Sequence, residues 1–192
     1  MKLRTVSIAL STTIISVCFV AQTYAQTASS SPLMISPSVL TVATQSGYIL
    51  PFPGVLPDSP LYVFKTIRDR LVSFFISDPL KRSSFDLLQS DKRMNAVVFL
   101  TSVPKPDTAL TITTISKALN YYEEGTSELR TARKIGESVT EMKKEYLNAA
   151  GKYDEVVQTL EQSATGGYSN DLSTNEKRLL DLEKQVTLIK EK

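Results

Sequence analysis

Proline placement is the feature of this sequence that most restricts its fold. All nine prolines lie at or before Pro106, and residues 107–192 contain none. Proline removes a backbone N–H donor, and its ring clashes with the preceding helical turn, so the interiors of long helices exclude it. The distribution predicts turns and shorter elements up to Pro106 and long helices beyond it. We expect an all-α fold, an open array or bundle of four to five helices with a long helical hairpin.

The first 25 residues contain the three parts of a secretion signal. Lys2 and Arg4 precede an apolar stretch over residues 6–21, and Thr-Tyr-Ala at residues 23–25 is a small-x-small cleavage site. A membrane anchor is the alternative, but a span needs about 20 apolar residues, and this stretch is shorter and interrupted by Ser and Thr. We predict a signal peptide that is cleaved after Ala25. The mature chain is then extracytoplasmic, secreted or associated with the cell envelope, and has no transmembrane span.

The predicted mature chain begins with a linker. Residues 26–50 are rich in Ser, Thr, Ala and Pro and have no helical period, which is typical of a flexible segment. Residues 51–58 contain three prolines, which favour an extended, turning path. We therefore predict a helical domain over residues 51–192.

Two helices are predicted from a polar cap that is followed at once by proline. Ser59 and Asp78 each precede a proline, which is tolerated at the first helical position because its missing N–H would be unbonded there. These signals predict helices over residues 59–76 and 78–102. The first helix has an apolar stripe at spacings of three and four, which we expect to face the core. The stripe consists of Leu61, Phe64, Ile67, Leu71 and Phe75.

The proline-free part of the chain predicts three more helices. Asp107 is the expected cap of a helix over residues 107–135. Capping boxes that start at Ser138 and Ser173 predict helices over residues 138–163 and 173–190. A break is expected near Gly136, with one continuous helix as the alternative. Apolar residues from this point alternate in steps of four and three, which indicates a heptad seam. The seam consists of Ile135, Val139, Met142, Tyr146, Ala149, Tyr153, Val156 and Leu160.

Composition excludes several classes of site. The chain has no His, and its single Cys, Cys18, lies in the predicted signal. The mature chain therefore offers no Cys/His metal site, no Ser-His or Cys-His nucleophile pair and no disulfide. Without Lys2 and Arg4 the basic residues fall from 22 to 20, equal to the 20 acidic residues. A neutral chain with no Trp lacks the charge footprint of nucleic-acid binding, and we expect no cofactor, metal or catalytic residue.

Two groups of residues are candidates for contact with a partner. Glu137, Glu141 and Glu145 recur every four residues, so they are expected on one helix face, where they would meet a basic partner or Ca²⁺ or form a solvated surface. Six of the tyrosines would form a carbohydrate-stacking surface or pack in the core with the hydroxyl at the rim, and core packing is favoured. These are Tyr62, Tyr121, Tyr122, Tyr146, Tyr153 and Tyr168.

Two segments resemble a bacterial family. Residues 56–65 read Leu-Pro-Asp-Ser-Pro-Leu-Tyr-Val-Phe-Lys, and the Asp-Pro-Leu-Lys-Arg segment at 78–82 is followed by Leu87-Leu88 and Arg93. Over roughly residues 51–130 this pattern resembles domain of unknown function 5667. The resemblance implies an exported, all-helical protein with no enzymatic activity and with Arg93 in a turn at the end of the second helix. It also implies a structural clamp made by Pro57, Pro60, Leu61, Tyr62 and Lys65, beside the cap Ser59.

We expect a non-enzymatic interaction or structural domain of the bacterial cell envelope, with an unknown protein or envelope component as partner and no nucleic acid. Self-association as a homo-oligomer through residues 135–160 is one form of this hypothesis. The alternative is an extracytoplasmic helical chaperone or stress sensor that binds unfolded clients or lipids, which an uncovered apolar stripe would favour. An enzyme is the third class, and a buried carboxylate pair in a cleft would support it.

Overall fold

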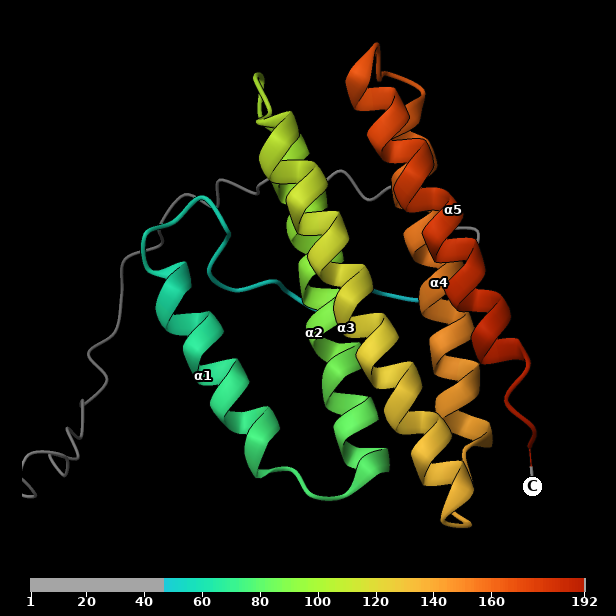
Figure 1. Ribbon diagram of the computed structural model, residues 1–192. Coiled ribbons are helices and arrows are strands. Elements are labelled where there is room, and N and C mark those ends of the chain that lie inside the picture. Colours follow the sequence, from blue (N-terminus) through green and yellow to red (C-terminus); the bar gives the residue numbers. More distant parts are fainter. Residues whose placement is uncertain (1–46, 192) are drawn as a thin grey trace, which may run out of the picture. The chain divides into compact units, whose positions relative to one another are not determined.

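The computed structural model describes residues 47–191, so the predicted signal peptide, its cleavage site and most of the predicted linker lie outside the described residues. Within that range the chain is all-α, as predicted, with no strand (Figure 1). The helices are α1 (Tyr62–Phe75), α2 (Pro79–Thr101), α3 (Thr108–Lys134), α4 (Thr140–Glu161) and α5 (Gly167–Thr187).

Local capping determines where α2 and α3 begin. The carboxylate of Asp78 accepts hydrogen bonds from the backbone N–H groups of Leu80 (2.9 Å) and Lys81 (3.1 Å). Asp107 accepts from the N–H of Leu110 at 3.0 Å. Each carboxylate bonds N–H groups that have no partner inside the helix, which confirms both predicted caps.

The other three predicted helix starts were wrong. Ser59 lies in a turn before α1, and its hydroxyl accepts from the N–H of Leu61 at 3.3 Å, while the helix itself begins at Tyr62 without a side-chain cap. Val139, not Ser138, precedes α4. α5 begins at Gly167, well before the predicted Ser173, because the positive φ of Gly166 (61°) turns the chain directly into the helix.

The predicted break between the third and fourth helices is confirmed, and the continuous helix is excluded. α3 ends at Lys134, and Gly136 adopts a φ of 94°. This left-handed conformation favours glycine and ends many helices. The chain can therefore reverse direction between α3 and α4.

The closest packing pairs α2 with α3 and α4 with α5, which lie side by side in Figure 1. The heptad seam faces this interior, with Val139, Tyr146, Ala149, Tyr153 and Val156 buried. Ile135, at the start of the seam, is exposed. The buried seam is used inside the chain and leaves little surface there for a second copy.

Three tyrosine rings occupy the centre of the core. Tyr146 and Tyr153 meet the ring of Tyr122 edge to face, with centroids 4.9 Å and 5.9 Å apart. The Tyr122 hydroxyl donates to the carbonyl of Tyr146 at 3.0 Å. Core packing is thus confirmed for these residues, but their hydroxyls are bonded inside the protein and not at its rim, because a buried hydroxyl needs a partner.

Gly125 allows α3 to approach this core closely. A Cβ at this position would collide with the Tyr146 hydroxyl, and it would lie 3.0 Å from the Cβ of Asp86 and 3.1 Å from the carbonyl of Ser83. Two of these neighbours are backbone or inner side-chain atoms, which cannot move without shifting α2. The close contact of α2, α3 and α4 therefore requires glycine here.

We predict that Gly125→Ala lowers the free energy of unfolding by about 2 kcal/mol, the usual cost of overpacking a core. Gly151→Ala is the matched control, because Gly151 is an exposed helical glycine with no atom within 4 Å of an added Cβ. Alanine at position 151 should raise the stability by about 0.5 to 1 kcal/mol through helix propensity. Urea unfolding of both variants tests this, and an equal effect of the two substitutions would contradict it.

Candidate functional site

Helix α1 packs with its apolar side outward, opposite to the prediction. The side chains of Tyr62 and Asp69 are buried, whereas Phe64 is 71% exposed and Phe75 77% exposed. Among the described helices, α1 brings its backbone close to α2 alone. The predicted core stripe was therefore placed on the wrong side of the helix.

We call the exposed apolar side the α1 outer face. Its members follow one another at helical spacing from the residue before α1 to the end of the helix, so they form one continuous surface. A contiguous apolar surface of this kind on a folded chain usually marks an interaction site. The α1 outer face consists of Leu61, Val63, Phe64, Ile67, Leu71, Val72, Phe74 and Phe75.

Lys65 fastens α1 to the preceding segment. Its ammonium group donates to the carbonyls of Pro53 (2.5 Å) and Val55 (3.3 Å) and lies 5.5 Å from the centre of the Tyr62 ring. Burial lowers the pKa of Lys65. These contacts support a structural role for Tyr62 and Lys65.

The other residues of the expected clamp lie elsewhere. Pro57, Ser59 and Pro60 belong to the turn before α1. Leu61 is exposed and belongs to the outer face. The residues of the expected clamp and cap are therefore divided among the fastening, the turn before α1 and the exposed outer face.

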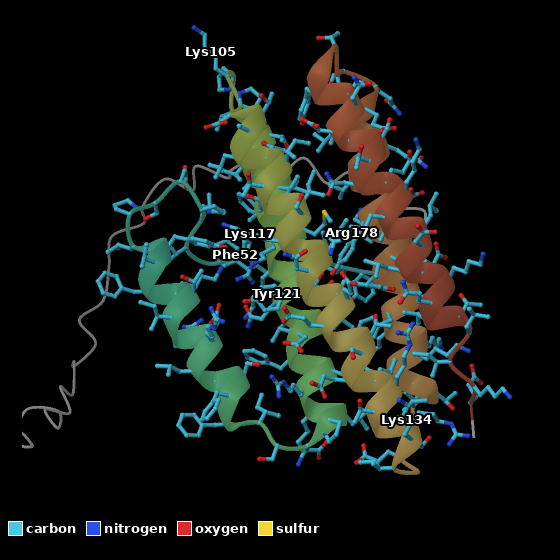
Figure 2. All side chains as sticks on the ribbon, viewed as in Figure 1. Phe52, Lys105, Lys117, Tyr121, Lys134 and Arg178 are labelled. Carbon is cyan, nitrogen blue, oxygen red and sulfur yellow. The ribbon has the colours of Figure 1, made fainter. Side chains whose placement is uncertain are left out.

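The inner side of α1 faces charged groups. Asp69 is 2% exposed, and its Oδ1 accepts from the guanidinium of Arg68 at 2.8 Å and 3.1 Å. Arg93 is also 2% exposed and lies in the middle of α2, not in a turn at its end. Its guanidinium stacks 4.0 Å from the ring centre of Tyr121, which lies midway along α3 (Figure 2).

The bonding of this polar contact is incomplete. Within the described residues, Oδ2 of Asp69 and Nε of Arg93 are buried without a hydrogen-bond partner. Buried polar groups contribute to stability only when they are fully bonded. The contact between α1 and α2 is therefore weak compared with an apolar one of the same size.

A second polar cluster joins the start of the domain to the core. The hydroxyls of Tyr48 and Tyr153 donate to the two oxygens of Asp91, each at 2.7 Å. Burial raises the pKa of Asp91 to about 6, although both hydrogen bonds act in the opposite direction. Asn95 adds a bond to the carbonyl of Pro51 at 2.8 Å. The cluster attaches the segment before α1 to α2.

Asp86 is a buried carboxyl of a different kind. Burial, reinforced by the charge of Glu124, raises its pKa to about 7, and its Oδ1 has no hydrogen-bond partner within the described residues. Asp91 is bonded to Tyr48 and Tyr153, and neither Asp86 nor Asp91 acts on the pKa of the other, so nothing joins the two carboxyls as an acid–base pair. They therefore give no support to an enzyme.

An open hollow of about 510 Å³ lies between the C-terminal ends of α3 and α5. It is lined by Arg130, Arg133, Lys134 and Lys190, of which Figure 2 labels Lys134 at the end of α3. Arg130 donates to Gln185 and Arg133 to the carbonyl of Lys190, each at 2.8 Å. Basic side chains at helix C-termini are favoured by the helix dipole, so a structural role accounts for them.

The three predicted partner-facing glutamates do not share a helix. Glu137 lies in the connection between α3 and α4, whereas Glu141 and Glu145 are exposed on α4. The four-residue spacing was misleading because α4 begins only at Thr140. We do not regard these residues as one binding surface.

Residues 47–191 contain neither a cluster of metal ligands nor a membrane-spanning helix. No group of three or more acidic, His or Cys side chains in this range could hold a metal ion. None of the helices in this range is long and apolar enough to cross a membrane. Comparison of the chain with protein-family models, curated proteins and solved structures finds no match.

Sequence reasoning missed Asp69, Asp86 and Asp91. Asp69 follows Tyr62 by seven residues, or two helical turns, so the two side chains lie on the same side of α1. This spacing could have shown that α1 has a polar side. The burial of Asp86 and Asp91 depends on α3 and α4, which no local pattern in α2 reveals.

We predict that Asp86 makes stability depend on pH. Because its pKa in the folded protein, about 7, exceeds the ordinary 3.8, the folded state holds its proton more tightly, and stability falls as pH rises from 4 to 7. Asp86→Asn has no carboxyl to titrate, so its free energy of unfolding should not show this fall. As pH rises from 4 to 8, the free energy of unfolding of the variant minus that of the wild type should therefore increase by about 2 to 4 kcal/mol. Urea unfolding across this range measures the difference, and parallel pH profiles would contradict it.

Proposed function

We propose that the protein is a non-enzymatic interaction domain of the bacterial cell envelope that binds its partner through the α1 outer face. The observation that carries the proposal is the exposure of eight apolar side chains on and next to one helix of 14 residues. Removing apolar surface from water is the main driving force for association, and this surface is available without unfolding. Helices α2–α5 supply a separate core to which α1 is attached.

Three features support the non-enzymatic part of the proposal. The sequence has no His, and its only Cys is Cys18. Asp86 and Asp91, the described carboxyls whose pKa values are raised to about 7 and 6, have structural surroundings. The resemblance to domain of unknown function 5667 agrees with a protein that binds and does not catalyse.

A chaperone that binds unfolded clients is the second candidate function, because it would also need an exposed apolar surface. The two functions differ in the range of partners. A docking domain contacts one kind of partner, whereas a chaperone contacts many unrelated unfolded chains.

A photo-crosslinking experiment tests the proposal. A benzophenone amino acid replaces Phe74 in the full chain, which the producing organism then expresses; the control carries it in place of Leu188. Both side chains are strongly exposed, at 77% and 72%, but Leu188 follows α5, remote in sequence from α1. We expect light-dependent adducts with one kind of partner from position 74 and few from position 188.

Two outcomes would contradict the proposed function. Adducts with many unrelated unfolded proteins from position 74 would indicate the chaperone instead. Equal crosslinking from positions 74 and 188, or none from either, would show that the α1 outer face does not bind a partner.

A further inference from the structure

We infer that the partner of the α1 outer face is the surface of a negatively charged lipid bilayer, on which α1 lies parallel to the plane of the membrane. This inference rests on the proposed function and specifies its partner. Helices that bind in this way have an apolar side, basic residues beside it and too little total hydrophobicity to span the bilayer. α1 combines these properties.

The charges of α1 are arranged for an anionic surface. The helix contains Lys65, Arg68 and Arg70 against a single acidic residue, Asp69. Asp69 is buried on the inner side and paired with Arg68, so every solvent-exposed charged side chain within α1 is basic. Arg70 precedes Phe74 by one helical turn, so its guanidinium group borders the apolar side chains. Arg68 follows Phe64 by one turn and is exposed, although its guanidinium is also bonded to Asp69. Long basic side chains in this position reach the lipid headgroups while their stems stay in apolar surroundings.

The attachment of α1 to the domain favours a flat partner. The inner side, with Tyr62, Lys65 and Asp69, faces α2 and is bonded through Lys65 to the carbonyl of Pro53. A bilayer surface needs only one side of the helix, to a depth of about 5 to 10 Å.

A second copy of the chain fits the α1 outer face less well. Two such faces in contact would bring basic side chains together without an exposed acidic residue of α1 to pair with them, which is unfavourable.

The absence of tryptophan from the sequence allows a direct test in the full chain. Phe74→Trp places a single environment-sensitive fluorophore in the α1 outer face, and Leu188→Trp places one at an equally exposed control position. Each protein is mixed with vesicles of phosphatidylcholine alone or with about one-third phosphatidylglycerol, with and without bromine-labelled chains. These lipids supply a neutral and an anionic surface.

We expect blue-shifted emission and bromine quenching for Phe74→Trp with the anionic vesicles, and neither change for Leu188→Trp. The apparent partition coefficient should be at least about tenfold higher for anionic than for neutral vesicles and should fall as salt is raised from about 0.05 M to about 0.5 M. The double variant Arg70→Glu with Phe74→Trp should have a several-fold lower partition coefficient for the anionic vesicles than Phe74→Trp alone.

The inference is overturned if the Phe74→Trp emission does not respond to anionic vesicles, or if it responds equally to neutral ones. It is also overturned if this emission is already blue-shifted without vesicles, because another part of the protein would then cover the face. Crosslinking from position 74 to a single protein, together with no response to vesicles, would refute the lipid surface and leave the proposed function intact. Failure of both experiments would refute both.

Discussion

The orientation of α1 depends on the polar side chains of its inner side. Asp69 and Arg93 are both buried, and Lys65 bonds the carbonyls of Pro53 and Val55. The bonds of Lys65 join α1 to the preceding segment, so they hold one rotation of the helix about its axis. In that rotation the apolar side chains point away from the domain. The exposure of the α1 outer face is thus a consequence of where the charges are held.

The rest of the domain is stabilised independently of that surface. The rings of Tyr122, Tyr146 and Tyr153 fill the centre of α2–α5. Gly125 leaves room for the Tyr146 hydroxyl, which donates to the carbonyl of Ser83. None of the α1 outer-face side chains belongs to this core. Binding and folding are therefore assigned to different residues, so the binding surface can be altered without loss of the fold.

Local signals predicted part of this arrangement from sequence. The caps at Asp78 and Asp107 were found because a carboxylate bonds N–H groups only two or three residues away. Ser173 has the same kind of signal but lies inside α5, where its hydroxyl bonds Glu161, because nothing between Gly167 and Ser173 stops the helix from starting earlier. Capping residues permit a helix start but do not impose one.

The rotation of α1 was not predictable from its own sequence. Apolar periodicity divides a helix into two sides, and in most soluble proteins the apolar side is buried. Here the polar side is buried against α2, and its Asp69 lies close enough to Tyr121 of α3 to act on the pKa of that side chain. Both of these helices lie outside residues 62–75, so no pattern within that range identifies them. The same holds for the raised pKa of Asp86, which arises from burial against α3.

The stability of a double variant, Phe64→Ser with Phe75→Ser, tests the orientation of α1 most directly. Both side chains are exposed in this structure, so the free energy of unfolding, measured with urea, should stay within about 0.5 kcal/mol of the wild-type value. A loss of about 3 kcal/mol or more, typical of removing a buried Phe, would show that these rings pack in a core and would contradict the account.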